Sequence, residues 1–386
     1  MTERPLRIAI LTHSTNPRGG VVHALELGDA LTRLGHEAVV HAPDRTGAGF
    51  FRETLCGTIG VPASEVDGDV TAMVETRVSD YLRYFDRPGA RRFDIWHAQD
   101  GISGNALATL TANRLIGGFA RTVHHIDKFQ DWRLVSLQKR AIDTATELVV
   151  VSRVWQQVLR RDFGRAATVV GNGVDIRRFS PVADDTDSQL RAKLNLAGAP
   201  VFLTIGGIEA RKNTIAMLAA FGSVQRRWPQ ARFVIAGGAS VLNHAAYQQQ
   251  FAEALARSAL PAGAVICAGP LLQDEMSALY RLADALVFAS MTEGFGLVVL
   301  EAMASGLPSV VSRVAPFTEH LGDDDVVWCD PHNPASIASA MQAALDPAVR
   351  SRVVANGVAV AARHDWKTVA LAHLPIYSQT LEACDA

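Results

Sequence analysis

The segment "ALVFASMTEGFGLVVLEAMASGLPSVVS" (residues 285–312) decides the fold, because it reads as strand, glycine loop, helix and strand. Such short apolar strands are typical of parallel sheets that helices cover on both faces. The helix ends where glycine and proline stop it. The parts are the strand ALVFAS, the loop glycines Gly294 and Gly296, the helix LVVLEAMA, and the terminators Gly306 and Pro308.

Two glutamates, Glu293 and Glu301, stand at the loop and inside the helix of this segment. A retaining glycoside hydrolase would hold two carboxylates about 5–5.5 Å apart across the scissile bond. Here both lie in one local segment with a helix start between them, which favours a ligand clamp. Glu301 lies about one turn into an apolar helix and needs a polar partner. A ribose diol is one such partner, and a backbone group or an arginine of the same domain is the other.

The same alternation of strands and helices continues on both sides of this segment, which predicts two doubly wound α/β domains in tandem. A length of 386 residues with 48% hydrophobic residues fits two domains with real cores. Ligands of such sheets bind beyond the carboxyl ends of the strands, so we expect a cleft between the domains. The other predicted strands include RIAILTH, HEAVVHAP, FDIWHAQD, ARTVHHID, ELVVVS, VFLTIGG, RFVIAGG and AVICAG.

Composition and motifs exclude several classes. A net charge of −2 does not indicate a nucleic-acid partner. The four cysteines lack zinc-ligand spacing, and neither the G-x-G-x-x-G fingerprint of dehydrogenases nor a P-loop occurs. The N-terminal apolar run is too short for a secretory signal, and no run reaches the ~18 apolar residues that span a bilayer. We therefore expect a cytoplasmic protein, with membrane contact at most peripheral, at the inner face.

Two glycine loops could receive a phosphate. Gly19 and Gly20 precede the first helix, whose N-terminus offers N–H groups to an anion; a plain turn explains them equally well. The loop GGIEARKN (206–213) follows a strand and carries Arg211 and Lys212, cations that suit a diphosphate. A solvated basic turn is the alternative.

Three histidines, His97, His124 and His125, lie at predicted strand ends of the first domain. They are either structural hydrogen-bonding groups or part of a site. The acidic runs DDTD and GDDDVV lie in predicted surface turns. We expect no metal site.

Four segments together resemble the retaining glycosyltransferases of family 4, also called glycosyl transferases group 1. This resemblance covers nearly the whole chain and implies the GT-B fold, with two facing Rossmann-like domains and a cleft between them. The E-x7-E block is the most specific of its motifs. The segments are PRGGVVH, VVGNGVDIRRFSP, EGFGLVVLEAMASGLPSVVS, and HDW at 364–366 followed by LPIYSQ.

The resemblance also implies the domain limits. Residues 1–181 would form the acceptor-binding domain, and residues 182–365 the domain that binds a nucleotide-sugar donor. A last helix, 366–386, would cross back onto the first domain.

Residue roles follow from the same resemblance. Glu293 would lie beside the donor sugar, and Glu301 would hold the ribose diol. The backbone around Phe295, Gly296 and Leu297 would bind sugar hydroxyls and phosphate.

Lys212 would neutralise the diphosphate with help from the N–H of Gly20, and His124 would contact the donor sugar. The catalytic set would thus be Glu293, His124 and Lys212. The family usually has an arginine where this chain has Gly207, and Arg211 could supply that charge instead.

The implied reaction is that of a hexosyltransferase: a hexosyl unit moves from a nucleoside diphosphate sugar to an acceptor hydroxyl with retention of anomeric configuration. It would need no cofactor and no metal, with uridine favoured over guanosine in the donor. The acceptor would be a small molecule, a glycan or a lipid-linked molecule. A nucleotide-sugar epimerase and a non-catalytic nucleotide-sugar binding protein are the alternatives.

Overall fold

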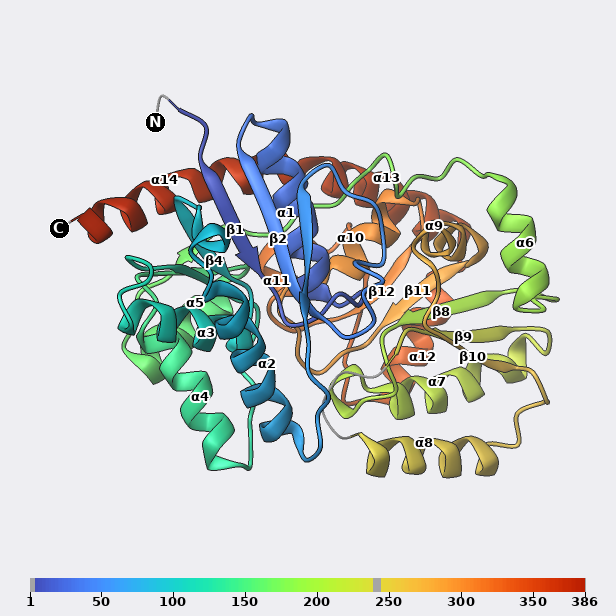
Figure 1. Cartoon of the computed structure of the whole chain (residues 1–386). Coiled ribbons are helices and arrows are strands. Elements are labelled where there is room, and N and C mark those ends of the chain that lie inside the picture. The colour runs from blue at the N-terminus through green and yellow to red at the C-terminus, as the bar shows by residue number, and fades with distance from the viewer. Residues whose placement is uncertain (1–3, 239–243, 386) are drawn as a thin grey trace. The chain divides into compact units, whose positions relative to one another are not determined.

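The computed structural model of the chain describes residues 4–238 and 244–385, and it divides into two compact units. The first is Met1–Asn172 with Trp366–Ala386, and the second is Gly173–Asp365. Figure 1 shows that each unit is a sheet with helices on both faces. The first and last residues of the predicted domains, residues 1 and 386, lie outside the described residues.

The first unit has a seven-stranded parallel sheet of order β3-β2-β1-β4-β5-β6-β7. Its strands are β1 Arg7–Leu11, β2 Glu37–Asp44, β3 Gly57–Pro62, β4 Ile95–Ala98, β5 Ala120–Val123, β6 Glu147–Val150 and β7 Thr168–Val169. Its helices are α1 Gly19–Arg33, α2 Val70–Phe85, η1 Pro88–Arg91, α3 Gly101–Ala112, α4 Trp132–Asp143, α5 Arg153–Phe163 and α14 Trp366–Asp385.

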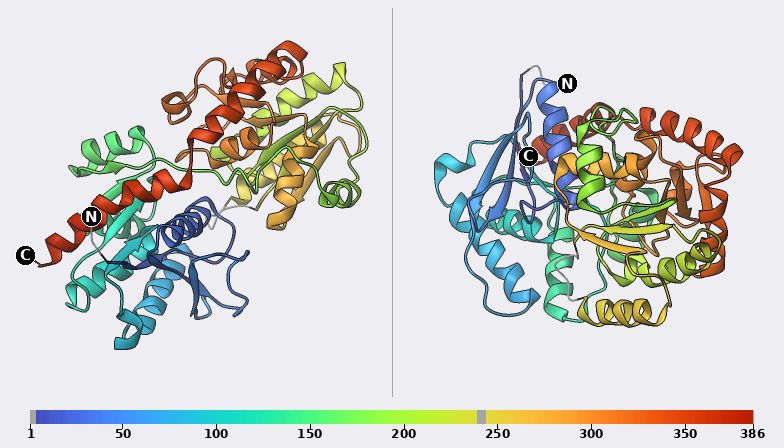
Figure 2. Two further views of the ribbon diagram at one scale, coloured as in Figure 1. Left: turned by 90° about the horizontal axis from the view of Figure 1, so that it is seen from above. Right: turned by 90° about the vertical axis from the view of Figure 1, so that its right-hand side faces the viewer.

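The strand order of this sheet reverses direction at β1, which pairs with β2 on one side and β4 on the other. Helices α1 and α14 pack together, whereas α2, α3, α4 and α5 form a second row. In Figure 2 the long red helix α14 runs along this unit. The carboxyl ends of β1 and β4 therefore meet at the switch point where such folds bind ligands.

Large aromatic side chains fill the core of the first unit between the sheet and its second row of helices. Tyr81, Phe85 and Phe119 are fully buried, and the ring of Phe85 lies edge-on to Trp96 with centroids 5.0 Å apart. The hydroxyl of Tyr81 donates to the carbonyls of Thr12 and His41. The polar tip of this buried ring is thus satisfied.

Aspartate side chains cap the N-termini of several helices. The carboxylate of Asp100 accepts from the backbone N–H of Ser103 at 2.9 Å and begins α3. Asp131 does the same at the start of α4, accepting from Arg133 at 2.9 Å. These caps satisfy backbone donors that the first turn of a helix leaves without partners. At the other end of α1, Gly35 takes the φ of 91° that the predicted glycine stop requires.

The second unit has a six-stranded parallel sheet of order β10-β9-β8-β11-β12-β13. Its strands are β8 Val201–Ile205, β9 Arg232–Ala236, β10 Val265–Gly269, β11 Ala285–Phe288, β12 Ser309–Ser312 and β13 Val327–Cys329. Its helices are α6 Asp185–Lys193, η2 Ala210–Lys212, α7 Thr214–Arg227, α8 Ala245–Arg257, α9 Gln273–Leu282, α10 Leu297–Ala304, α11 Phe317–His320, α12 Pro334–Ala343 and α13 Pro347–Arg363.

This second sheet has its own switch point, between β8 and β11. Helix α7 packs against α8 and α12, while α9 packs against α6 and α10 against α13. The loops after β8 and β11 therefore leave the sheet side by side. These are the loops that carry the predicted phosphate-binding and E-x7-E residues.

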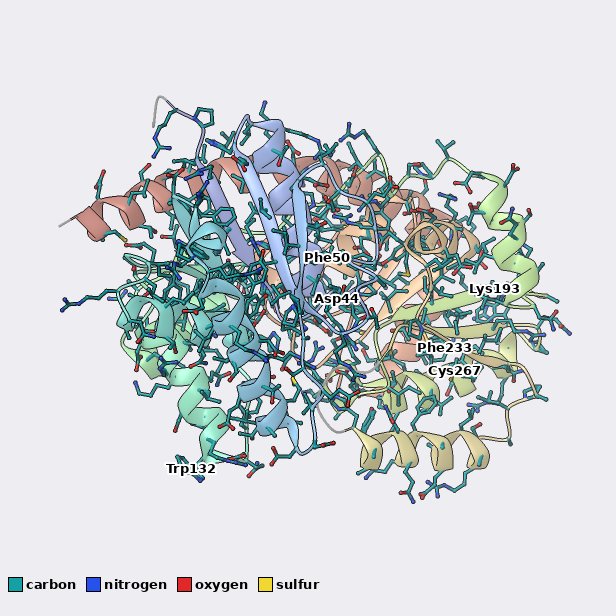
Figure 3. The ribbon with its side chains drawn as sticks, in the orientation of Figure 1. Asp44, Phe50, Trp132, Lys193, Phe233 and Cys267 are labelled. Carbon is teal, nitrogen blue, oxygen red and sulfur yellow. The ribbon has the colours of Figure 1, made fainter. Side chains whose placement is uncertain are left out.

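Three elements differ from the sequence prediction. The acidic run DDTD (184–187) was expected to lie in a surface turn, but it forms the start of helix α6, because the carboxylate of Asp184 caps the helix by accepting from the N–H of Thr186 at 2.9 Å. Figure 3 labels Lys193 at the end of α6. Its Nζ atom pairs with Oε1 of Glu275 at 2.6 Å. Strands β3 and β13 were not predicted, because glycines interrupt the first and an acidic turn precedes the second.

The unit boundary also differs from the predicted limit after Pro181, since the structure divides between Asn172 and Gly173. Residues just after this point pack on the second unit. The backbone carbonyl of Arg178 accepts from the hydroxyl of Ser277 at 2.7 Å, and Phe179 meets the ring of Tyr280 edge-on.

Candidate active site

The decisive segment folds as strand β11, a glycine loop, helix α10 and strand β12, and α10 covers the residues that were predicted to be helical. Gly296 begins the helix with φ at 102°, a conformation that favours glycine. A Cβ atom there would lie 2.4 Å from Cε1 of Phe317. Space and backbone conformation therefore both require glycine at this position.

Glu293 lies at the centre of a group of charged side chains. Its Oε1 atom is 2.7 Å from Nζ of Lys212 and 2.9 Å from a guanidinium nitrogen of Arg211. A second buried carboxylate, Glu209, is 3.6 Å from the Arg211 guanidinium. The structure thus brings together three predicted site residues, and it adds Glu209, which sequence reasoning missed.

Backbone contacts hold this charged group in place. The carbonyl of Arg211 accepts from the N–H of Met291 at 2.9 Å, which joins the loop after β8 to the loop after β11. Asn213, in the left-handed conformation with φ at 63°, donates its amide to the carbonyls of Ala289 and Pro331. Both loops are therefore fixed to each other before any ligand arrives.

The charges in this group set each other's protonation. Burial raises the pKa of Glu293, but Lys212 and Arg211 outweigh burial and lower it below the usual value of a glutamate. Burial lowers the pKa of Lys212, and Glu293 opposes that shift. Glu293 is therefore a carboxylate at neutral pH. It is suited to accepting hydrogen bonds and not to donating a proton.

The stem of Lys212 runs across a glycine and an aromatic ring. Its Nζ atom lies 4.6 Å from the ring centroid of Phe288, a cation–π contact. A Cβ atom on Gly206, whose φ is 133°, would lie 2.8 Å from Cε of Lys212. Any side chain at this glycine would displace the ammonium. The neighbouring Gly207, where the family usually has arginine, leaves Arg211 and Lys212 as the cations at this carboxylate.

Glu301 has a different kind of partner. Its Oε2 atom accepts a hydrogen bond of 2.6 Å from the hydroxyl of Tyr280 on α9. Of the alternatives left open by the sequence, a partner within the same domain is thus present, although it is a tyrosine and not an arginine. Sequence reasoning missed Tyr280, because its distance along the chain from Glu301 carries no periodic signal.

The ring of Phe295 supports the glycine loop from within the protein. It is 6% exposed and stacks on the imidazole of His320, with centroids 4.4 Å apart and planes 4° apart. Burial, with a contribution from His364, lowers the pKa of His320 to about 4. Phe295 therefore offers its backbone, and not its ring, to a ligand, and Leu297 follows as the first residue of α10.

In the first unit, Gly20 and His124 come together at the start of α1. A Cβ atom on Gly20 would lie 3.4 Å from the imidazole of His124. The Nε2 atom of His124 is 3.0 Å from Oε1 of Gln99, the residue after strand β4 that sequence reasoning had not singled out. Burial, with further contributions from neighbouring histidines, lowers the pKa of His124 well below its usual value. His124 is thus a neutral hydrogen-bonding group.

His124 is the partly exposed member of a group that we call the buried histidine cluster, whose other members, His23, His97 and His373, are fully buried. The rings of His23 and His124 meet edge-on at 4.9 Å, and those of His97 and His373 lie 5.5 Å apart. His97 is fully buried and bonds both Tyr377 and Thr122 through its ring nitrogens. His97 is therefore a core histidine with satisfied partners.

Within residues 4–238 and 244–385, no group of three or more metal-ligating side chains gathers. None of the helices in this described part is long and apolar enough to cross a membrane. The four cysteines, Cys56, Cys267, Cys329 and Cys384, form no disulfide.

Two parallel sheets with separate switch points, and the charged group at one of them, match a known class of enzyme. Residues 17–178 match the family described as Glycosyltransferase Family 4, and residues 186–358 match the family Glycosyl transferases group 1. Solved structures with this fold include the HepE protein of Anabaena, at a TM-score of 0.76, 17% identity and coverage of 97% of this chain and 99% of that one. A second is sucrose-phosphate synthase of Thermosynechococcus elongatus, at a TM-score of 0.79 and 21% identity, with coverage of 98% of this chain and 100% of that one.

The class is therefore that of glycosyltransferases with the GT-B fold. Within that class, the chain belongs to family 4. It is 27% identical to a D-inositol 3-phosphate glycosyltransferase of Xylanimonas cellulosilytica over 97% of this chain and 96% of that protein. It is 32% identical to a glycogen synthase of Mycobacterium tuberculosis over 54% of this chain and 48% of that protein.

Proposed function

We propose that the chain transfers a hexosyl unit from a nucleoside diphosphate sugar to an acceptor hydroxyl, with retention of anomeric configuration and without a metal ion. Family membership supports the transfer of a sugar. The Anabaena neighbour was solved with UDP and glucose and also with UDP-glucose, which supports a uridine donor. A nucleotide-sugar epimerase finds no support in these matches.

The observation that carries this proposal is the position of two cations at one carboxylate. Negative charge grows on the diphosphate as the bond to the sugar breaks, and protein cations that are already in place stabilise that charge without reorganising. Lys212 and Arg211 both contact the same oxygen of Glu293, so their positions are set in advance. In this proposal they take the place of the metal ion that other transferases use.

Each remaining site residue has one task in the proposal. The first turn of α10, entered through Gly296, receives donor oxygens with its backbone N–H groups. Glu293, as a carboxylate, accepts from sugar hydroxyls, and Glu301 accepts from the ribose diol. In the first unit the N–H of Gly20 contributes to the phosphate, and His124 contacts the donor sugar.

The reaction balances with the substrates alone. The bond between the anomeric carbon and the diphosphate oxygen breaks, and its electron pair leaves with the diphosphate. The acceptor oxygen forms the new bond on the same face through an oxocarbenium-like transition state, and its proton passes to the departing diphosphate. The low pKa of Glu293 agrees with this assignment, because a permanent carboxylate is no proton donor.

A thermal-shift panel of UDP, GDP and ADP tests the donor first, and the best nucleotide then directs a screen of its sugars against candidate acceptors. We expect UDP to raise the melting temperature most. NMR of the product determines whether configuration is retained, and an inverted product would overturn that part.

Activity in EDTA tests the metal requirement. We expect turnover to persist after dialysis against the chelator. Complete loss that Mg²⁺ or Mn²⁺ restores would refute the role given to Lys212 and Arg211. A protein that binds UDP-sugar and turns over no acceptor would instead support the non-catalytic alternative.

A further inference from the structure

Tyr280 contacts the carboxylate of Glu301, which binds the ribose in the proposed function. Helix α9 places its ring in the core with no exposed surface, and its hydroxyl lies 2.6 Å from Oε2 of Glu301. Phe179 packs edge-on against the ring at 5.7 Å. One turn earlier on α9, the hydroxyl of Ser277 donates to the carbonyl of Arg178. The phenol is therefore held from two sides.

The direction of this hydrogen bond is fixed. Burial and the charge of Glu301 raise the pKa of Tyr280 well above its usual value, so the phenol keeps its proton and is the donor. A hydroxyl that donates to a carboxylate forms a short, charge-assisted bond, stronger than one between neutral groups. Oε2 of Glu301 is thereby held at the phenol, and covalent geometry then sets the direction of Oε1.

A free glutamate side chain would lose rotational freedom on binding a ligand, and that loss opposes binding. A carboxylate that the protein has already oriented does not lose that freedom again when the ligand binds. A vicinal diol is especially demanding, because its two hydroxyls must meet the acceptor in one orientation.

We propose that Tyr280 is a positioning residue for ribose recognition: its hydroxyl orients the Glu301 carboxylate toward the vicinal diol of the donor nucleotide. The proposal rests on the proposed function, in which Glu301 binds the ribose. Tyr280 itself is buried and acts only through Glu301.

The test compares two nucleotides that differ in one hydroxyl. Calorimetry measures the Kd of UDP and of 2′-deoxy-UDP for the wild type and for Tyr280→Phe, which keeps the ring and removes the hydroxyl. We expect the Kd of UDP to rise about tenfold, as for the loss of one hydrogen bond to a charged group. The Kd of 2′-deoxy-UDP should change less than about twofold, because that ligand lacks the diol. An inactive fraction lowers the stoichiometry and not the Kd, so partial unfolding does not hide the result.

Kinetics give a second readout. KM for the donor should rise with the Kd of UDP, while kcat at saturating donor changes little, because the residue orients a group that holds the ribose. The matched control is Tyr81→Phe, which removes another buried tyrosine hydroxyl, one that donates to backbone carbonyls in the first unit. That variant should bind UDP as the wild type does.

The outcomes separate this inference from the function on which it rests. An equal loss of affinity for both nucleotides in Tyr280→Phe, or no loss for either, overturns the positioning role. Glu301→Gln then tests the ribose role itself. If Glu301→Gln loses the preference for UDP over 2′-deoxy-UDP while Tyr280→Phe keeps it, the ribose role stands and the positioning role fails. If Glu301→Gln keeps the full preference, the ribose role fails as well.

Discussion

Two groups of buried polar side chains, one in each unit, are stabilised in opposite ways. In the second unit, Glu293 and Glu209 lie buried as charged groups beside Lys212 and Arg211. In the first unit, the buried histidine cluster is uncharged, since burial lowers the pKa of His23 to about 3 and that of His373 to about 4.

This difference separates two kinds of polar interior. A buried charge is costly unless a partner of opposite sign lies close, so charged groups occur there as a set whose members depend on each other. A neutral imidazole needs only hydrogen-bond partners and tight packing. The first arrangement suits the binding of an anion, and the second suits a rigid wall beside the glycine loop at the start of α1.

The largest effect that we predict from this comparison is on catalysis at the charged group. In Lys212→Ala, kcat should fall about 10²–10³-fold, the loss typical of removing one group that stabilises the transition-state charge. Lys193→Ala is the matched control, because Lys193 is an exposed lysine of the same unit that pairs with Glu275 away from the charged group. Steady-state kinetics of both variants decide the matter, and near-normal turnover of Lys212→Ala would remove this cation from the mechanism.

Glycines at the two loops should differ in their tolerance of a side chain. Gly296→Ala should lower the free energy of unfolding by at least about 2 kcal/mol, because the Cβ clashes with Phe317 and the φ of 102° is strained for alanine. Gly19→Ala should change it little, because within 4 Å the added carbon would meet no described atom apart from its chain neighbours and the backbone of its own helix. Urea denaturation of both variants measures the difference, and equal stability would contradict the contrast.

As the pH falls, the buried histidines of the first unit should lose their contribution to stability before Glu293 and its partners Lys212 and Arg211 do. A histidine whose folded pKa lies below the unfolded 6.5 contributes stability above that pH and loses it as the pH falls toward the folded pKa. Each buried histidine then contributes a slope of about 1.4 kcal/mol per pH unit. The lowered pKa of Glu293 has a window of the same sign at lower pH, since its contribution to stability is lost only as the pH falls below the usual glutamate pKa of 4.5.

Hydrogen exchange at pH 5 and pH 7 checks this order segment by segment. At pH 5, α1 and α14 should lose protection relative to β8 and β11. His320 in the second unit also has a folded pKa of about 4 and adds a smaller loss there. Earlier opening of the second unit would contradict the expected order.

The smallest effect concerns the neutral hydrogen-bonding group. His124→Ala should lower kcat/KM about tenfold, as for one lost hydrogen bond to a charged or strongly polar group. The matched control is His125→Ala, because the neighbouring side chain is exposed and pairs with Asp127. A pH–rate profile above pH 5.5 should keep the same shape in both variants, and a titration that vanishes only in His124→Ala would show that His124 changes charge after all.

Local patterns predicted the fold well. The apolar runs predicted most of the strands and the doubly wound class of both domains, and α10 begins and ends where glycine and proline indicated. Helix α6 was missed, because aspartates at a helix start resemble those of a turn until their caps are seen.

The site was predictable only where its residues are neighbours in sequence. The loops after β8 and β11 each showed their own glycines and charges. The pairing of Glu293 with Lys212 needs the crossover that sets those strands side by side. The buried histidine cluster draws members from α1, β4, the end of β5 and α14, and no window of sequence contains them together.

Helix α14 sets an order for folding on the ribosome. The second unit is one continuous stretch, Gly173–Asp365, whereas the first needs His373 and Tyr377 of α14 to complete its histidine cluster. During synthesis the second unit can therefore finish before the first, although the first emerges earlier. Until α14 has been synthesised, part of the core of the first unit would stay exposed to solvent. A substitution that destabilises α14 should therefore also destabilise the first unit, whose other residues come from the opposite end of the sequence.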